Sequence, residues 1–203
     1  MHIQELAISG AFEITPISHK DDRGLFAEWF KASTLEAATG RPFVLRQANV
    51  SVSKANTFRG IHSSSLNHGQ AKYVTCVHGS VIDYVIDLRV GSPTFSEWTA
   101  VELDDDKRNA VFLSEGLGHA FLALTEGAVV SYLVSNPFSP TDEFGINPLD
   151  PDIGLTFDVD VSDLILSPKD IDALSLAEAQ RVGKLPSMDE YSSFQSALIQ
   201  EAK

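Results

Sequence analysis

The stretch Phe58-Arg59-Gly60-Ile61-His62 indicates the fold of this chain, together with the segment Gln70-Ala71-Lys72-Tyr73-Val74 that follows it. Both are typical of short β-strands, and a loop rich in Ser, Asn and Gly joins them. Arg59, His62 and Lys72 are thereby brought close together. A charged group on a core-facing strand is costly unless it is paired or used. The pattern predicts either a site where these polar heads converge or an edge strand whose charges face water.

The strand that contains Lys72 is expected to form a hairpin with the β-branched run 81–88, through a turn at Gly79-Ser80. In that register Lys72 lies opposite Asp87 on a mostly apolar face. The other members of that face are Val74, Cys76 and Asp83.

Short strands continue along the chain at 94–103, 110–113 and 128–134, with turn signals between them. This spacing favours a mainly β fold, a sandwich or barrel of the jelly-roll kind, over a βαβ fold. Helices are expected near the C-terminus, from Ile171 to Val182 and after Ser187. We therefore expect residues 1–164 to form a β jelly-roll domain that includes an N-terminal arm. Residues 165–203 are expected to form a C-terminal segment whose helices pack on that domain.

Residues 43–53 alternate between polar and apolar side chains. On a surface strand such alternation is ordinary. On the inner face of a barrel it would offer uncharged hydrogen-bonding groups to a polar ligand. Both interpretations remain open for Gln47, Asn49, Ser51 and Ser53.

The net charge of −13 over 203 residues argues against nucleic acid or an acidic membrane as a partner, because binding to either depends on excess Lys and Arg. The single cysteine excludes intrachain disulfides. The first residues lack the basic and apolar regions of a leader, and no apolar run is long enough to cross a membrane. These features favour a cytoplasmic protein.

The motifs leave acid–base chemistry as the reaction type. His62 is not part of a His-x-His arrangement followed by Glu, so no metal is expected, and no phosphate loop or dinucleotide fingerprint predicts a cofactor. His, Lys, Tyr and Asp suit proton abstraction next to a carbonyl. Taken alone, however, Tyr132 is more typical of a core position, and Asp170 of the cap of a helix starting at Ile171.

Several motifs occur in a fixed order from the start of the chain to about Pro186. They are Asp22-Arg23-Gly24-Leu25-Phe26 with Glu28, Gln47-Ala48-Asn49, Arg59-Gly60-Ile61-His62, Gln70-Ala71-Lys72, Val85-Ile86-Asp87-Leu88-Arg89 with Gly91-Ser92-Pro93-Thr94-Phe95, Glu115-Gly116-Leu117-Gly118-His119-Ala120-Phe121, Tyr132, and Leu166-Ser167-Pro168-Lys169-Asp170. In this order they resemble the dTDP-4-dehydrorhamnose 3,5-epimerase family of cupin-fold sugar-nucleotide epimerases.

The resemblance implies a metal-free jelly-roll homodimer whose substrate is dTDP-4-keto-6-deoxyglucose. His62, oriented by Asp170, would remove the proton next to the C4 ketone, Lys72 would stabilise the enolate oxygen, and Tyr132 would be the acid on the opposite face of the sugar. Arg59 would hold the diphosphate and nucleoside, with Arg23 and Phe26 supplied by the partner subunit. The other implied substrate-binding residues are Glu28, Gln47, Asn49, His119, Phe138, Glu143 and Lys169.

Two departures from the family pattern bear on which carbons react. Ser63 stands where the family usually has an aromatic residue after the histidine, and Phe138 where it often has tyrosine. The expected activity is inversion at C3 and C5. Alternatives are a C3-only or C5-only epimerase, a 3,4-ketoisomerase, and a non-catalytic cupin that binds a nucleotide sugar, which would have no need of all four catalytic groups.

Overall fold

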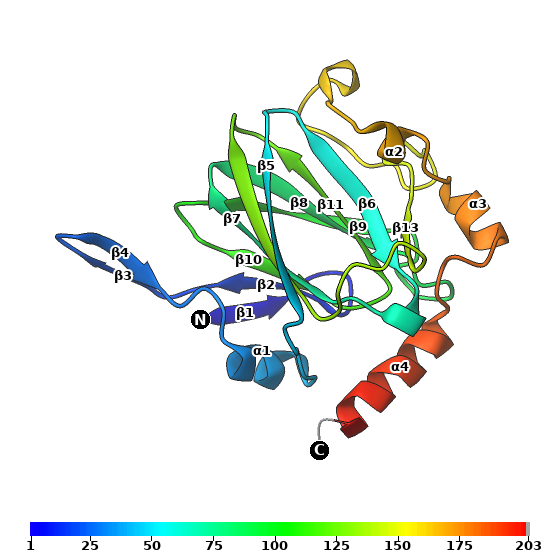
Figure 1. Ribbon diagram of the computed structural model, residues 1–203, viewed down its shortest axis with the longest axis horizontal. Helices are drawn as coiled ribbons and strands as arrows, with labels where there is room; N and C mark the ends of the chain where they lie inside the picture. Colours follow the sequence, from blue (N-terminus) through cyan, green and yellow to red (C-terminus); the bar gives the residue numbers. More distant parts are fainter. Residues whose placement is uncertain (202–203) are drawn as a thin grey trace.

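Two antiparallel sheets pack face to face in the computed structural model, which describes residues 1–201 (Figure 1). The six-stranded sheet runs in the order β1 (His2–Glu5), β2 (Ala11–Thr15), β10 (Ala110–Leu113), β7 (Lys72–His78), β12 (Ala128–Val134) and β5 (Gln47–Ser53). The five-stranded sheet runs in the order β13 (Glu143–Gly145), β6 (Phe58–Ser64), β11 (Leu117–Ala123), β8 (Ser80–Asp87) and β9 (Trp98–Asp104). The expectation of a mainly β jelly-roll fold is confirmed.

The expected hairpin between β7 and β8 is wrong. The two strands are consecutive, but β7 pairs with β10 and β12, whereas β8 pairs with β11 and β9 in the other sheet. Gly79, at φ 74, turns the chain from one sheet to the other. Val74 of β7 and Val85 of β8 consequently meet across the sandwich in one core cluster. Lys72 therefore faces the interior, as expected, but does not pair with Asp87.

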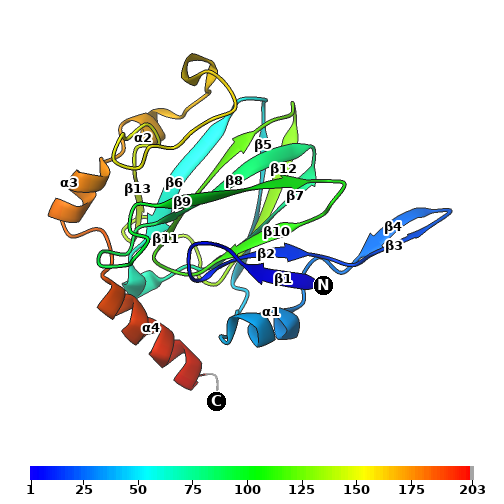
Figure 2. The ribbon, with the colours of Figure 1, turned by 180° about the vertical axis from the view of Figure 1, so that it is seen from behind.

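A second apolar core lies on the outer face of the five-stranded sheet. Phe58, Tyr84 and Ile86 point outward from their strands and are covered by residues of the C-terminal segment, among them Leu176 and Leu185. Figure 2 shows this segment running along the outside of β6 and β9. Strands buried on both faces carry few polar alternates. This explains why every residue of β11 is buried.

The helices are short and lie at the edges of the sandwich: α1 (Ala32–Thr39), α2 (Pro168–Ile171), α3 (Leu176–Arg181) and α4 (Met188–Glu201), with 3₁₀ turns η1 (Leu66–His68) and η2 (Val161–Asp163). The single helix expected from Ile171 to Val182 is wrong, because Leu174 forms a β-bridge with Ile146 that interrupts it. Ser175 then starts α3 with a capping box. No helix among residues 1–201 is long and apolar enough to span a membrane.

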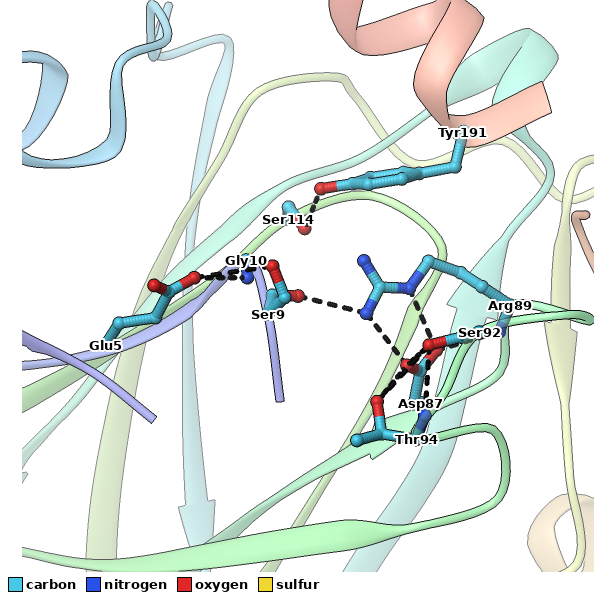
Figure 3. Close-up of polar contacts among 9 residues, drawn as sticks. All are labelled: Glu5, Ser9, Gly10, Asp87, Arg89, Ser92, Thr94, Ser114 and Tyr191. Atoms are coloured by element: carbon cyan, nitrogen blue, oxygen red, sulfur yellow. Dashed lines mark hydrogen bonds and ion pairs between the residues drawn. The ribbon is translucent and has the colours of Figure 1, made fainter. Parts of the chain in front are cut away.

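A buried arginine anchors α4 to the sandwich (Figure 3). The Nε and Nη2 atoms of Arg89 each donate to the Asp87 carboxylate at 2.8 Å, and Nη2 also donates to the Ser9 carbonyl. The Tyr191 ring of α4 stacks 4.6 Å from the guanidinium carbon, and its hydroxyl lies 3.1 Å from Ser114 Oγ. The motif from Val85 to Phe95 is thus structural here.

The hairpin of β3 (Ser18–Asp21) and β4 (Gly24–Ala27) extends away from the sandwich, as both ribbon views show. Phe26 on β4 is 65% exposed. The division of the chain at residue 164 stays a prediction. The last two residues of the predicted C-terminal segment, 202 and 203, lie outside the described part of the chain.

Candidate active site

A cavity of about 760 Å³ opens between the two sheets. The C-terminal segment closes one wall through Leu166, Ser167 and Asp170. The cavity brings together most of the site residues expected from the sequence: Gln47, Asn49, Arg59, His62, Lys72, His119, Tyr132, Phe138, Glu143, Lys169 and Asp170.

Strand β5 supplies the uncharged polar wall of this cavity. Gln47, Asn49, Ser51 and Ser53 all line it, whereas the alternate residues face outward, with Val50 67% exposed. The strand therefore faces its polar side inward, which decides between the two interpretations that the alternation allowed. Gln47 Nε2 donates to Asn49 Oδ1 at 2.7 Å, and Gln47 Oε1 accepts from the backbone of Phe138 at 3.2 Å.

The His62 imidazole is held by a carboxylate from the far end of the chain. Its Nε2 lies 2.7 Å from Asp170 Oδ1, and Ser167 Oγ donates to Asp170 Oδ2 at 2.8 Å. Burial alone would raise the pKa of Asp170, but these two hydrogen bonds, together with the charges of His62 and Lys169, hold its pKa below the ordinary value. Ser167, and not Asp170, caps the helix, which begins at Pro168. Asp170 is therefore free to orient the imidazole.

Gly60 lets the strand that carries His62 approach its neighbour. Its φ is 124, and a Cβ at this position would lie 2.5 Å from Ala120 Cβ on β11. His62 and His119 are direct partners across these two strands. His119 Nε2 in turn lies 2.7 Å from Asp83 Oδ2, whose pKa is raised by burial despite the His119 contact. Each cavity histidine thus has its own carboxylate.

Lys72 projects into the cavity from β7. Its Nζ is buried and lies 2.5 Å from Gln70 Oε1. Burial lowers the pKa of Lys72 to about 8, while the carboxylates of Glu143 and Glu115 act in the opposite direction. The ammonium form therefore dominates at pH 7, and its recorded hydrogen-bond partner, Gln70, is neutral.

Tyr132 enters the cavity from β12 and thus from the sheet opposite His62. Burial raises the pKa of its phenol, Glu143 adds to the rise, and Arg59 opposes it, so the phenol keeps its proton at neutral pH. Arg59 is anchored beside it, with Nε donating to Ser53 Oγ at 3.1 Å and Nη2 to the Val52 carbonyl at 3.3 Å.

The arrangement has the parts needed to move a proton on carbon. A histidine–carboxylate pair lies on one wall, a phenol enters from the opposite sheet, and a buried ammonium lies in the same cavity. Base, acid and oxyanion stabiliser are the three groups that enolate chemistry requires.

Three expected site residues do not line this cavity. Arg23 and Phe26 lie on the projecting hairpin, where Arg23 pairs with Asp21, and Glu28 lines a separate small cavity with Lys31. The hairpin leads them away from the sandwich of their own chain (Figure 1). Glu28 does not line the cavity of its own chain, and its expected role in substrate binding stays a prediction. The contribution of Arg23 and Phe26 across a subunit boundary stays a prediction.

Sequence reasoning gave no role to Gln70, Asp83 or Ser167. Gln70 precedes Lys72 by two residues, the spacing that puts two side chains on one face of an extended segment. Asp83 was recognised as an acid on a core-facing strand, but its histidine partner lies 36 residues later, beyond what local pattern predicts. Within residues 1–201 no group of three or more His, Cys, Asp or Glu side chains is placed to hold a metal ion.

Known proteins resemble this chain over nearly its full length. A family model described as dTDP-4-dehydrorhamnose 3,5-epimerase matches residues 5–178. A dTDP-4-dehydrorhamnose 3,5-epimerase of Mycolicibacterium smegmatis is 48% identical over 198 residues, which cover 98% of this chain and 97% of that protein. A dTDP-4-dehydrorhamnose 3-epimerase of Streptomyces niveus is also 48% identical, over 186 residues that cover 92% of this chain and 89% of that protein. The solved structure of ChmJ, a 3'-monoepimerase from Streptomyces bikiniensis in complex with dTDP-quinovose, matches with a TM-score of 0.92 at 42% identity and covers 96% of this chain and 98% of that chain.

Proposed function

The chain belongs to the dTDP-4-dehydrorhamnose 3,5-epimerase family, and we propose that it inverts both C3 and C5 of dTDP-4-keto-6-deoxyglucose. It acts as an epimerase on dTDP-linked keto-deoxysugars, the activity that its relatives share. The observation that carries the proposal is one cavity that holds a His62–Asp170 pair, a buried Lys72 and Tyr132. Inversion next to a ketone needs these three kinds of group.

The reaction begins with removal of the proton beside the C4 ketone. Asp170 occupies Nε2 of His62, which leaves Nδ1 to take the proton. The carboxylate also stabilises the imidazolium that forms, as the third member of a catalytic triad does. The electron pair of the broken C–H bond forms a double bond to C4, and the carbonyl pair moves onto the C4 oxygen, so the ketone becomes an enolate.

Lys72 stabilises the enolate oxygen that this step creates. Its ammonium is already positioned and desolvated, so little reorganisation is needed when negative charge develops. A low local dielectric strengthens the attraction between the two charges.

Tyr132 completes the inversion by donating its proton to the opposite face of the same carbon. Its raised pKa keeps the phenol protonated until the carbanion needs it. The imidazolium and the tyrosinate then return to their starting states by proton exchange with water, so the cycle consumes no co-reactant.

The nucleotide part of the substrate requires positive charge, which an overall acidic chain must supply locally. Arg59 lines the cavity and Lys169 lies at its C-terminal wall. In a homodimer the hairpin of a second copy would bring Arg23 and Phe26 to this opening. The homodimer is supported by an exposed apolar surface on the edge strand β5, where Val50 is 67% and Val52 64% exposed.

Inversion at C3 alone is the second candidate. The relative that is named a 3-epimerase is as similar to this chain as the relative that is named a 3,5-epimerase. Phe138 lines the cavity without a hydroxyl group, so it cannot take part in proton transfer at the second carbon. A cytoplasmic location completes the proposal, and cell fractionation would check it.

The experiment is proton NMR of dTDP-4-keto-6-deoxyglucose with the enzyme in D2O. Loss of both the H3 and H5 signals, with products of inverted configuration, supports the 3,5-epimerase. Loss of H3 alone supports the second candidate. A product with the keto group at C3 identifies a ketoisomerase, and unchanged substrate that binds without exchange identifies a non-catalytic binder.

A further inference from the structure

Lys72 is held by a neutral side chain. Among residues 1–201 the hydrogen bond recorded for its Nζ is to Gln70 Oε1, at 2.5 Å, and its Nζ takes part in no ion pair. We propose that Gln70 is the positioning residue of the site: it aims the Lys72 ammonium at the substrate oxygen without adding a negative charge that would compete with the enolate. This inference rests on the proposed function of Lys72 as the group that stabilises the enolate.

The orientation of the Gln70 amide is fixed from its other end. Nε2 donates to the Asn136 carbonyl at 2.8 Å, and a carbonyl can only accept, so the amide oxygen must face Lys72. Asn136 also donates from Nδ2 to the Gly69 carbonyl at 2.7 Å, and the Gln70 backbone donates to Ser64 Oγ at 3.2 Å. Two hydrogen bonds therefore hold Gln70 itself, and a third holds the residue before it.

Helix α4 secures the loop from which Gln70 extends. Gly69 packs so closely that a Cβ there would lie 2.8 Å from the Phe194 ring of α4 and 2.8 Å from Glu115 Cγ. Only a residue without a side chain fits at this contact. The loop is thus wedged between α4 and Glu115, and the position of Gln70 is set by the folded core.

The charged groups around Lys72 explain why a neutral partner matters. Two carboxylates, Glu115 and Glu143, act on Lys72 through their charges. Glu115 is already paired: Arg41 binds both of its oxygens, with Nη2 donating to Oε1 at 2.9 Å, and Gln195 donates to Oε2 at 3.0 Å. Glu143 of β13 lines the same cavity as Lys72. The remaining titratable groups lining the cavity are His62, His119, Tyr132, Arg59, Lys54, Lys169 and Asp170.

Aiming the Lys72 ammonium and keeping its charge available to the enolate make opposite demands on the residue that binds it. A carboxylate at position 70 would hold the ammonium firmly but would neutralise it and compete with the enolate. An apolar residue would leave the charge intact but would no longer aim it or satisfy a buried ammonium, which then loses its proton more easily. An amide oxygen is an acceptor without a charge, so it meets both demands.

The test compares Gln70→Glu and Gln70→Met with wild type, and Gln4→Glu on the exposed strand β1 serves as the matched control. Proteins labelled with [ε-¹³C]lysine report the titration of Lys72 directly, with its signal assigned from the Lys72→Arg variant. Deuterium exchange into dTDP-4-keto-6-deoxyglucose gives kcat from pH 6 to 10. Circular dichroism confirms that each variant is folded.

In wild type we expect Lys72 to titrate near pH 8, the value to which burial lowers its pKa, and exchange to fall above that pH, because the ammonium is the active form. In Gln70→Glu the Lys72 titration and the alkaline fall in kcat should both move up by about one pH unit or more, while kcat at pH 7 drops at least about tenfold. In Gln70→Met the Lys72 titration and the alkaline fall in kcat should both move to lower pH. Gln4→Glu should match wild type.

The proposal is overturned if the Gln70 variants lose activity while the Lys72 titration stays in place, since that is the behaviour of a purely structural residue. It is equally overturned if the titration moves and kcat does not. Absence of exchange by wild type, with the lysine titrating near pH 8, would instead count against the proposed function.

Discussion

His62 and Asp170 lie 108 residues apart in the chain, yet Nε2 of His62 is 2.7 Å from Oδ1 of Asp170. The histidine belongs to the barrel strand β6, whereas the aspartate belongs to the short helix α2 that lies against it. The C-terminal segment therefore completes the wall of the cavity as well as covering the outer face of the sheet.

Replacing Asp170 by Asn should lower kcat at least about 10²-fold and leave KM nearly unchanged. The amide cannot stabilise the imidazolium that forms in the reaction, so kcat falls. Binding of the substrate before the reaction does not depend on this charge, so KM changes little. Steady-state kinetics checks this, with Asp172→Asn, at the exposed residue that follows the same helix, as the control. A rise in KM with normal kcat would place Asp170 in binding.

Tyr132→Phe should separate exchange from inversion. If Tyr132 only returns the proton, His62 can still remove one and hand back deuterium on the same face. NMR in D2O would then show deuterium incorporated with retained configuration. Complete loss of exchange, equal to the loss of inversion, would contradict the separate roles.

Asp87→Asn should destabilise the fold by about 3–5 kcal/mol at pH 7, because it leaves the buried Arg89 charge without its partner. Burial would raise the pKa of Asp87, but hydrogen bonds from Arg89, Ser92 and Thr94 hold it below the ordinary value. A lowered carboxyl pKa stabilises the folded state above the unfolded pKa of about 3.9, and this contribution is lost as pH falls through the folded value.

Urea unfolding at pH 7 and below pH 4 measures both parts of this prediction. The difference between wild type and Asp87→Asn should shrink at the lower pH, whereas the exposed Asp106→Asn should stay within about 0.5 kcal/mol of wild type. An equal difference at both pH values would show that the Asp87 charge does not stabilise the fold.

Val50→Asp should convert the proposed homodimer to a monomer, because it places a charge in the exposed apolar face of β5. Light scattering after size exclusion reads the mass, and Val182→Asp, also an exposed valine, is the control. Activity should fall with the dimer, since Arg23 and Phe26 would no longer reach the opening. A monomeric wild type with full activity would contradict this.

The sequence predicted the orientation of side chains on a strand more reliably than it predicted which strands pair with each other. Alternation placed Lys72 toward the interior, but no local signal says whether the following strand joins the same sheet or the opposite one, so the pairing with Asp87 was wrong. The helix from Ile171 failed for a similar reason, since Ile146 draws Leu174 into a bridge. His62 and Asp170 were brought together by family resemblance, because spacing alone left Asp170 as a helix cap.

Deuterium exchange by His62→Asn, measured by proton NMR of dTDP-4-keto-6-deoxyglucose in D2O, tests directly whether His62 is the base. Asparagine keeps a polar group beside Asp170 but cannot accept the proton at neutral pH. We expect both exchange and inversion to fall at least about 10²-fold, while the fold and nucleotide-sugar binding persist. Exchange at the wild-type rate would contradict the assignment of His62 as the base.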